Sequence, residues 1–222
     1  MSRVVLKLGG RVAEEAFAHA LELVEAGHEV VVVHGAGPQI SAELKARGIP
    51  VRFVAGRRFT NPATLAVVRA SLVAVGAGLA AALGPRALHL VGDEIGLRAR
   101  RLPELGRVGQ PLACRPAAVE KALAAGRLPV VSPIAVGPLN VNADEAASAL
   151  AAGLDAERIV FVSDVPGVLL EGTVAARIHA PLADELLAAG VFEGGIVPKL
   201  LAAVRAARVG IRAEIGATVV VP

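Results

Sequence analysis

The chain has almost no aromatic side chains: its 222 residues include five Phe and neither Trp nor Tyr. Proteins that bind single-stranded nucleic acid stack the bases on aromatic rings, so a platform of that kind is excluded. The hydrophobic content of 55% must then come mainly from Val, Leu, Ile and Ala. Such residues are typical of parallel strands that are buried on both faces.

Cysteine is nearly absent as well. The single Cys114 cannot form an internal disulfide or a cysteine zinc site, and we interpret it as a structural thiol. Apolar runs such as 30–33 have the length of a strand, far short of the roughly 20 residues that span a bilayer. No cationic leader with an apolar stretch and a cleavage site opens the chain. We therefore expect a cytoplasmic protein without a membrane partner.

Charge of either sign is modest, since 23 Lys and Arg oppose 20 Asp and Glu for a net charge of +3. The basic residues are scattered apart from Arg57-Arg58 and a cluster at 98–101, which we interpret as a solvated hairpin face. No helix-turn-helix signal stands out. The mild basicity favours an anionic small substrate or an acidic protein partner over nucleic acid.

Predicted strands and helices alternate along the chain. The segments 4–8 and 29–33 are typical of buried strands, and each leads through small residues into a helix, expected over 12–26 and 38–47. This alternation predicts a parallel sheet with right-handed crossovers. Further helices are expected over 62–83, 116–125, 181–189 and 199–207, strands over 87–91, 129–136, 158–163, 173–179 and 214–221, and a hairpin over 92–107. Because no linker or repeat interrupts this order, we expect one compact unit.

The most informative stretch is 128–154. An apolar run there predicts a buried strand, and Asn140, Asn142 and Asp144 then precede an Ala- and Leu-rich helix. Asn142 is the predicted N-cap, with Glu145 placed to complete a capping box. In open α/β sheets ligands bind at the carboxyl ends of the strands, where a strand leads into a helix. The stretch therefore predicts a binding site.

Glycine-rich turns follow the first two predicted strands, at Lys7-Leu-Gly-Gly10 and His34-Gly-Ala-Gly37. Such turns let backbone N–H groups approach an anion, and a helix N-terminus adds a favourable field. Neither is a Walker A loop or a dinucleotide fingerprint. Lys7 stands inside an apolar strand and Lys199 at the start of a helix. Both are candidate functional cations. The alternative for Lys7 is an edge strand from which its side chain reaches solvent, and the alternative for Lys199 is an ordinary exposed lysine on a helix.

Seven segments, in order across nearly the whole chain, resemble motifs of the amino acid kinase family, and within it those of the N-acetylglutamate kinases. They are Lys7-Leu-Gly-Gly10, Val33-His-Gly-Ala-Gly-Pro-Gln-Ile40, Gly56-Arg-Arg-Phe-Thr60, Gly106-Arg-Val-Gly109, Asn140-Val-Asn-Ala-Asp-Glu-Ala-Ala147, Ser163-Asp-Val-Pro-Gly-Val168 and Gly194-Gly-Ile-Val-Pro-Lys199. The Asn-x-Asn-Ala-Asp and Gly-x-Arg-x-Thr segments are the specific part. The Gly-Gly turns are shared with aspartate, glutamate, carbamate and uridylate kinases.

The resemblance implies one domain over 1–222, a three-layer α/β/α sandwich with a mainly parallel central sheet. The acyl amino acid would bind over about 1–150 and ATP over about 151–222. The implied reaction is phosphoryl transfer from MgATP to the side-chain carboxylate of N-acetyl-L-glutamate in arginine biosynthesis, with Mg²⁺ carried by the nucleotide and no metal held by the protein. A carboxylate with a pKa of roughly 4.3 is already ionised at neutral pH, so no general base is needed. Catalysis then reduces to positioning and to neutralising charge.

Carried over by position, the resemblance assigns roles to named residues. Lys7 and Lys199 would contact the phosphoryl group, and Asp144 would hold both ammonium groups. The expected substrate-binding residues are Gly9, Gly10, Gly35, Ala36, Arg58, Asn140 and Asn142. The expected nucleotide-binding residues are Lys7, Gly10, Ser163, Asp164, Gly167 and Lys199. Among them, Gly10, Gly35 and Ala36 would donate backbone N–H groups, and Arg58 would bind the α-carboxylate of the substrate.

Ala36 departs from the family pattern, which usually has glycine there, and its methyl group is expected to restrict φ and narrow the substrate pocket. The resemblance also favours a homodimer. One alternative is a kinase of carrier-protein-linked α-aminoadipate or glutamate in lysine biosynthesis, because a basic surface suits an acidic carrier. Another is a non-catalytic amino-acid-binding module, which would have no need for two cations at the transfer point.

Overall fold

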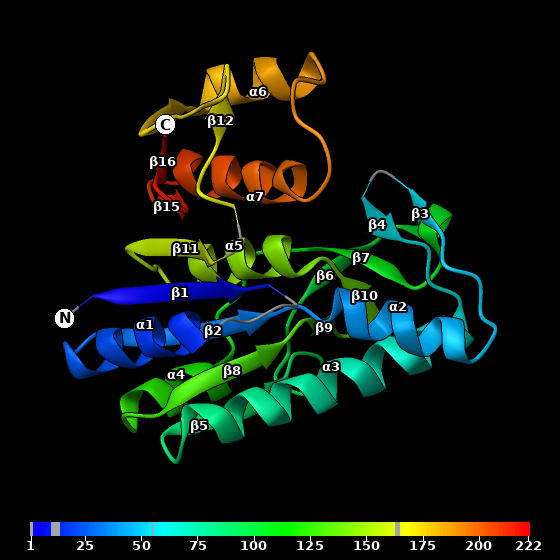
Figure 1. Ribbon diagram of the computed structural model, residues 1–222. Coiled ribbons are helices and arrows are strands. Elements are labelled where there is room, and N and C mark those ends of the chain that lie inside the picture. Colours follow the sequence, from blue (N-terminus) through cyan, green and yellow to red (C-terminus); the bar gives the residue numbers. More distant parts are fainter. Residues whose placement is uncertain (1, 10–13, 55, 163–164) are drawn as a thin grey trace.

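The computed structural model describes residues 2–9, 14–54, 56–162 and 165–222 (Figure 1). Within these residues the main sheet has eight strands in the order β14-β16-β15-β11-β1-β2-β8-β5. The six parallel strands are β1 (Arg3–Leu8), β2 (Glu29–His34), β5 (Ala87–Val91), β8 (Leu128–Ser132), β11 (Arg158–Val162) and β15 (Arg212–Ile215). Strand β16 (Thr218–Val221) is antiparallel to β15, and the edge strand β14 (Arg177–His179) is parallel to β16. The predicted mainly parallel sheet is confirmed.

Helices cover both faces of this sheet. Helices α1 (Glu14–Glu25) and α3 (Pro62–Leu83) lie on one face, with α2 (Gly37–Ala46) packed against α3. Helices α4 (Ala117–Ala124), α5 (Ala143–Gly153) and α7 (Ile196–Arg208) lie on the other, with α6 (Ala180–Ala188) packed against α7. The predicted three-layer α/β/α sandwich is therefore confirmed.

The alternation of side chains along the strands sorts the residues of β1 and β2 between the two faces. Val5 and Val31 join the apolar cluster beneath α4, α5 and α7, whereas Val4 and Val30 join the cluster beneath α1 and α3. Lys7 has the same parity as Val5 and therefore faces α5. By the same rule the even-numbered residues at the ends of β2 and β8 face α3. Polar side chains at the carboxyl edge are thus divided into two groups on opposite faces.

Smaller elements lie past the carboxyl ends of the main strands (Figure 1). A second sheet has the order β6-β7-β10-β9, with β6 (Ala99–Arg101), β7 (Val108–Pro111), β9 (Ile134–Ala135) and β10 (Leu139–Val141). A short 3₁₀ helix, η1 (Pro103–Leu105), connects β6 and β7, and β3 (Phe53–Val54) pairs with β4 (Arg57–Arg58) in a hairpin. A further pair, β12 (Leu169–Leu170) and β13 (Thr173–Val174), follows β11.

Several predicted boundaries were wrong. The single strand expected over 129–136 is two strands, because Pro133, which has no N–H, separates β8 of the main sheet from β9 of the second sheet. The strand expected over 173–179 is likewise divided into β13 and β14. The hairpin expected over 92–107 is shifted: its first strand, β6, lies within that range, and its second strand, β7, lies directly after it. Helix α7 begins at Ile196, three residues before the predicted start, so Lys199 lies in its first turn.

Helix α3 corrects the expectation that apolar runs are only strand-length. It has 22 residues, and its most apolar 18-residue window has a mean hydropathy of 1.9, which meets the length and composition of a membrane span. In this structure its buried side packs against β5, β8 and α2. Its exposed residues are mostly small, and include Ala66, Ala70, Ala74, Ala77 and Ala81.

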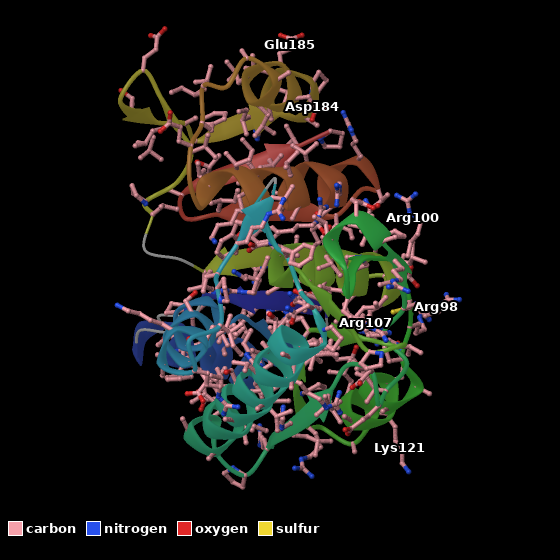
Figure 2. The ribbon with its side chains drawn as sticks, turned by 90° about the vertical axis from the view of Figure 1, so that its right-hand side faces the viewer. Arg98, Arg100, Arg107, Lys121, Asp184 and Glu185 are labelled. Atoms are coloured by element: carbon pink, nitrogen blue, oxygen red, sulfur yellow. The ribbon has the colours of Figure 1, made fainter. Side chains whose placement is uncertain are left out.

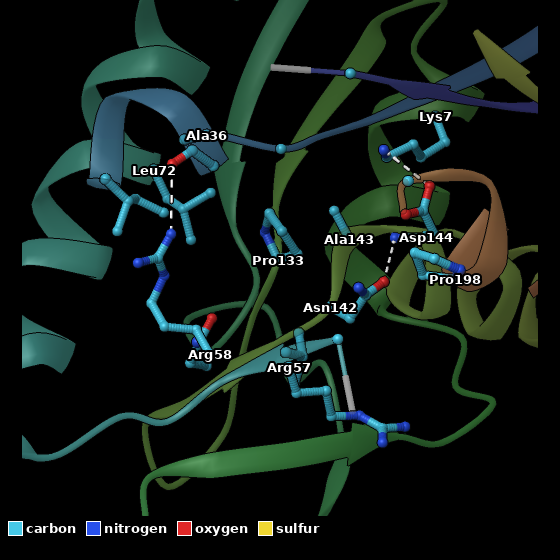
Figure 3. A pocket seen from close by; sticks show the side chains of 18 of the residues that line it. Lys7, Ala36, Arg57, Arg58, Leu72, Pro133, Asn142, Ala143, Asp144 and Pro198 are labelled. Atoms are coloured by element: carbon cyan, nitrogen blue, oxygen red, sulfur yellow. Dashed lines mark hydrogen bonds and ion pairs between the residues drawn. The ribbon is translucent and has the colours of Figure 1, made fainter. Parts of the chain in front are cut away.

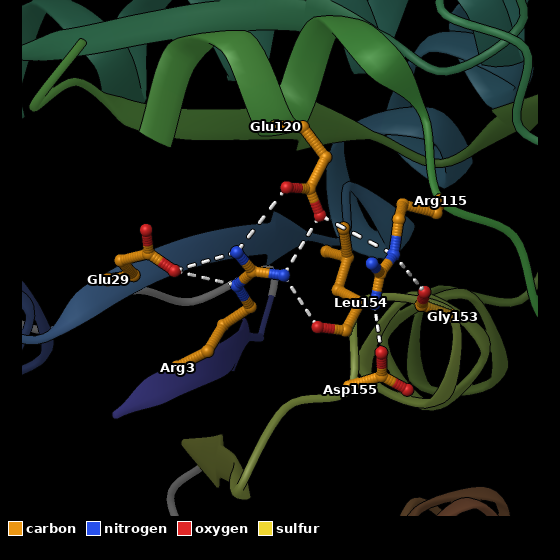
Figure 4. Close-up of polar contacts among 7 residues, drawn as sticks. All are labelled: Arg3, Glu29, Arg115, Glu120, Gly153, Leu154 and Asp155. Atoms are coloured by element: carbon orange, nitrogen blue, oxygen red, sulfur yellow. Dashed lines mark hydrogen bonds and ion pairs between the residues drawn. The ribbon is translucent and has the colours of Figure 1, made fainter. Parts of the chain in front are cut away.

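A network of ion pairs joins elements at the opposite, amino end of the strands (Figure 4). The Arg3 guanidinium donates to Glu29 Oε2 at 2.9 Å, to Glu120 Oε1 at 2.9 Å and to the Leu154 carbonyl at 2.6 Å. Arg115 pairs with Glu120 and with Asp155 and donates to a backbone carbonyl of α5. The network therefore connects β1, β2, α4 and the turn after α5.

Gly76 of α3 lies against the buried His34 and the partly buried His89, which gives a test of how α3 packs. A Cβ on Gly76 would lie 2.3 Å from His89 Nε2 and 2.8 Å from His34 Nε2. We expect Gly76→Ala to lower the free energy of unfolding by roughly 1–3 kcal/mol through overpacking, measured by urea denaturation. Gly78→Ala on the same helix is the control, since a Cβ there has no neighbour within 4 Å. That variant should be unchanged or more stable by up to about 1 kcal/mol, and equal effects of the two would contradict the packing described.

Candidate functional site

A cavity of about 450 Å³ opens at the carboxyl edge of the sheet (Figure 3). Nine of the predicted site residues line it: Lys7, Gly9, Gly35, Ala36, Arg58, Asn140, Asn142, Asp144 and Lys199. They come from segments spread over most of the chain. The structure therefore brings together most of the residues that the resemblance singled out.

The Asp144 carboxylate lies between two lysines. Lys7 Nζ is 2.8 Å from Asp144 Oδ1, and Lys199 Nζ is 3.7 Å from the same oxygen. Lys7 is only 5% exposed and Asp144 also 5%, so the solvent-reaching alternative for Lys7 is wrong. Buried charges of this kind persist only when they are paired. The arrangement places two cations around one anion, with net positive charge at the floor of the cavity.

Three helices begin at this cavity, and each contributes to its electrostatics. Helices α2 and α7 begin without a side-chain cap, at Gly37 and Ile196. Helix α5 is capped by Asn142, whose Oδ1 accepts from the N–H groups of Asp144 and Glu145 at 2.8 and 3.1 Å. Open helix N-termini favour anions, because their backbone N–H groups are unpaired and the helix dipole is positive there. The cavity is thus suited to a ligand with several negative charges.

Arg58 lies on the opposite side of the cavity from Lys7 and Asp144 (Figure 3). Its Nη2 donates to Ser41 Oγ at 2.9 Å. Its guanidinium stacks on the Phe53 ring, with Cζ 4.7 Å from the ring centroid. Its Nη1 is buried without a hydrogen-bond partner among the described residues. Burial lowers the pKa of Arg58 from its ordinary value. A carboxylate bound here would satisfy the unpaired donor and restore the balance of charge.

Asn140 is oriented by its neighbour Thr60. Asn140 Nδ2 lies 3.0 Å from Thr60 Oγ1, and that hydroxyl donates its only hydrogen to the Arg58 carbonyl at 2.8 Å. Thr60 must therefore accept from the Asn140 amide. This fixes the Asn140 side chain and leaves its carbonyl oxygen as an acceptor for an N–H group of a ligand.

The glycine-rich turn after β2 differs from its predicted role in part. The Gly35 N–H donates to the Leu8 carbonyl at 3.1 Å, so the predicted donation to a ligand is not available in this arrangement. Ala36 has φ −139° and ψ 31°, and its methyl group is buried in the cluster with Ile40 and Leu72. Because this φ is negative, the position does not require glycine, and the restriction of φ by the methyl group is compatible with this turn.

A second cavity of about 600 Å³ lies beside the first, between the loop after β11 and the start of α7. Its lining is largely apolar and includes Gly167, Leu169, Phe192, Ile196 and Lys199. Gly195 and Lys199 line both cavities, so the two adjoin at the start of α7. The predicted residues Gly10, Ser163 and Asp164 lie outside the described residues.

Sequence reasoning missed an ion cluster beside the site. The Glu145 carboxylate does not complete the expected capping box: its Oε1 pairs with Arg57 at 2.5 Å and with Arg205 at 3.2 Å. The motif segments contained Arg57 and Glu145, but no spacing rule linked them across 88 residues. The available signal in the sequence was a second acidic residue directly after Asp144, before an apolar helix.

Sequence reasoning also missed a buried polar network on the α3 face of the sheet. The Nε2 atoms of His34 and His89 lie 2.9 and 2.8 Å from Ser132 Oγ, which donates to the Leu72 carbonyl. Because that hydroxyl has one hydrogen, both imidazoles must donate from Nε2. Burial lowers the pKa of His34 to about 4, with smaller lowering contributions from His89 and Lys7. His34 is therefore neutral at physiological pH, consistent with a role in shaping the turn.

This network predicts a pH dependence of stability. The pKa of His34 falls from 6.5 to about 4 on folding, so stability is complete above pH 6.5 and decreases toward pH 4, by up to about 3 kcal/mol. Burial lowers the pKa of His89 too, which adds to the same trend. Urea denaturation between pH 4 and 7 measures the slope, which should flatten in His34→Gln. His19→Gln, on the surface of α1, is the control and should keep the slope of the parent protein.

Comparisons with known proteins were made for the sequence and for the fold. The model of the amino acid kinase family matches residues 2–217. The chain is 38% identical to the acetylglutamate kinase of Roseiflexus castenholzii over 225 positions, covering 95% of this chain and 87% of that protein. It is 39% identical to the acetylglutamate kinase of Geobacillus stearothermophilus over 218 positions, covering 91% and 84%.

Solved structures share the fold. The crystal structure of smu.665 from Streptococcus mutans has a TM-score of 0.90 at 25% identity and covers 99% of this chain and 98% of that one. The carbamate kinase of Giardia lamblia bound to AMP-PNP has a TM-score of 0.69 at 16% identity, covering 96% and 91%. These likenesses extend over the whole arrangement of strands and helices and are not confined to the cavity.

Proposed function

The chain belongs to the amino acid kinase family, and from that membership we propose that it transfers the γ-phosphoryl group of ATP to the side-chain carboxylate of N-acetyl-L-glutamate. The product would be N-acetyl-L-glutamyl 5-phosphate, an intermediate of arginine biosynthesis. The names of the two relatives at 38 and 39% identity support this substrate. The observation that carries the proposal is the pairing of Lys7 and Lys199 with one buried aspartate, opposite a buried arginine.

The two ends of the cavity match the two ends of an acyl amino acid. Arg58 would bind the α-carboxylate through its unpaired Nη1. The side-chain oxygen of Asn140 would accept a hydrogen bond from the amide N–H of the substrate. The side-chain carboxylate would then lie toward Lys7 on the opposite side. Since this carboxylate is ionised at neutral pH, no residue needs to remove a proton from it.

The lysines would act by neutralising charge. In phosphoryl transfer, negative charge is spread over the equatorial oxygens, and catalysis depends on positioning and electrostatic stabilisation. Lys7 and Lys199 extend from opposite lobes, from β1 and α7, and their shared contact with Asp144 keeps both ammonium groups aimed at one point. We assign Asp144 this positioning role rather than a role as a base.

The second cavity is the proposed nucleotide site. Its apolar lining suits a purine ring, and the uncapped start of α7 with Lys199 suits the phosphates. Mg²⁺ bound to the phosphates would supply further charge neutralisation. No group of three or more His, Cys, Asp or Glu within the described ranges has the geometry of a metal site, so the proposal gives Mg²⁺ to the nucleotide. This division makes about 1–150 the acyl amino acid lobe and about 151–222 the nucleotide lobe.

We also propose that the enzyme is a cytoplasmic homodimer. The exposed side of α3 is formed mainly by alanines, with few long polar side chains to solvate it. Small residues let two helices approach closely, so a second copy of α3 is a suitable partner for this face. Light scattering in solution measures the mass, and a monomer at micromolar concentration would contradict this part of the proposal.

The carrier-linked alternative draws on arginines in and beside the β6–β7 hairpin. Arg98 and Arg100 are exposed and Arg107 is half-buried, and the three lie on the same side of the molecule (Figure 2), where an acidic carrier protein would meet positive charge. The names of the relatives favour free N-acetylglutamate instead. Turnover with free N-acetylglutamate separates the two, because that substrate needs no carrier protein.

The experiment for the proposed function is ADP release from MgATP with purified protein. N-acetylglutamate, N-acetyl-α-aminoadipate, free glutamate and aspartate are compared at equal concentrations. We expect turnover with N-acetylglutamate well above the other three. If none of the four is turned over but ATP binding is measurable by calorimetry, the proposed substrate is overturned and a carrier-linked substrate is favoured. Silence without ATP binding would indicate a non-catalytic module.

Lys199→Ala tests the role of the α7 lysine. Because a charge that acts in the transition state affects turnover more than ground-state binding, we expect kcat to fall by about 100-fold or more with a small change in KM for N-acetylglutamate. Lys121→Ala, an exposed lysine on α4, is the control and should match the parent enzyme. An increase in KM with kcat unchanged would remove Lys199 from the catalytic residues.

A further inference from the structure

Glu145 holds one guanidinium from each side of the active-site cavity. Its Oε1 accepts from Arg57 at 2.5 Å and from Arg205 at 3.2 Å. Arg57 belongs to β4, in the hairpin that carries Arg58, and Arg205 belongs to α7, the helix that carries Lys199. We name these three residues, Arg57, Glu145 and Arg205, the interlobe clamp.

The clamp is more than a surface ion pair. The Glu145 side chain is 8% exposed, whereas those of Arg57 and Arg205 are 23% and 42% exposed. The acid is therefore desolvated, and removal of its partners would leave a buried charge uncompensated. Glu145 also follows Asp144 in the first turn of α5 and shares its Asn142 cap. The clamp and Asp144 thus belong to the same capped turn.

The β3–β4 hairpin needs such a link. Each of its strands has only two residues, and Phe53 and Val54 on β3 are exposed. A segment with so little buried apolar area has low local stability, so its position depends on polar contacts. Arg57 provides one of these to α5. Through that contact, Glu145 also determines where the adjacent Arg58 presents its guanidinium.

Helix α7 is positioned by the same carboxylate. Besides the apolar packing and the Lys199–Asp144 pair, Ser148 Oγ donates to the Ala202 carbonyl at 3.0 Å and joins α5 to the middle of α7, and the Glu145–Arg205 pair adds a further polar contact between these helices. Both contacts lie on the helix whose first turn carries Lys199. A shift of α7 along α5 would move the lysine away from the transferring group, and misplacement by about 1 Å costs roughly 100-fold in rate.

We propose that Glu145 is a positioning residue that couples the two substrate sites. Through Arg57 it positions Arg58, which would bind the acyl amino acid. Through Arg205 it positions Lys199 beside the transferring phosphoryl group. The inference rests on the proposed kinase function. It predicts that loss of the Arg57 contact changes mainly KM and that loss of the Arg205 contact changes mainly kcat. A residue that only maintains the fold would not separate these two effects.

The kinetic test compares four single variants in the full-length enzyme. Arg57→Met should raise KM for N-acetylglutamate by about tenfold with kcat nearly unchanged, and Arg205→Met should lower kcat by about tenfold with KM nearly unchanged. Glu145→Gln should produce both effects, and adding Arg57→Met to it should raise KM little further, since the charge that pairs with Arg57 is already removed. Arg208→Met is the matched control, because Arg208 lies on the same helix but pairs with Asp184. Equal losses of kcat/KM in all four single variants would overturn the clamp. So would strict additivity of the Glu145→Gln and Arg57→Met effects on KM in the double variant.

Hydrogen exchange provides a readout that does not depend on activity. The N–H groups of Phe59 and Thr60 donate to the Arg52 and Leu105 carbonyls, so they report on the order of the segment after β4. We expect Glu145→Gln to speed exchange severalfold both there and in the second turn of α7, whose N–H groups donate to the carbonyls of the first turn. Arg57→Met should speed exchange only in the former, and Arg208→Met in neither. If the parent enzyme is inactive on every acyl amino acid, the proposed function fails while this result still decides the coupling. Unchanged exchange in Glu145→Gln would overturn the proposed coupling. If the glutamine variant does not fold, unchanged exchange in Arg57→Met and Arg205→Met would overturn it instead.

Discussion

The pairing of one buried carboxylate with two lysines is the constraint on which the rest of the site depends. Lys7 and Lys199 come from elements separated by most of the chain, and two ammonium groups at a buried point repel each other unless an anion lies between them. Asp144 supplies that anion from the first turn of α5, where Asn142 caps the helix. The positions of β1, α5 and α7 are therefore fixed relative to one another by electrostatics as well as by apolar packing.

The alternation of side chains on the central strands divides the carboxyl edge into two chemically different sides. The odd-numbered side holds Lys7 and faces the paired charges of α5 and α7. The even-numbered side holds His34 and Ser132, a neutral network packed against α3. Burial keeps that network uncharged near neutral pH, so it adds no further positive charge beside the lysines. One face of the sheet thus provides reactivity and the other rigidity.

Much of the fold and part of the site could be predicted from the sequence, because local patterns determine them. Helix α3 has the predicted bounds, and the start of α5 follows from its predicted cap, Asn142. The resemblance brought Lys7, Asp144 and Lys199 together in advance. What escaped prediction was the partner choice of polar side chains across long separations: Glu145 was interpreted as a local cap residue but pairs with two arginines, and the Gly35 N–H pairs with β1. Pairing of this kind depends on tertiary geometry, which no local pattern encodes.

The ion network around Arg3 has a consequence for how such an enzyme can change over time. Its two arginines and three carboxylates lie at the amino end of the sheet, one full strand away from the cavity. Six residues of β1 span about 20 Å, roughly twice the Debye length at physiological ionic strength, so the nearly balanced charges at one edge exert little field at the other. Heat adaptation and substrate preference can therefore evolve at opposite edges of one sheet, each with little cost to the other.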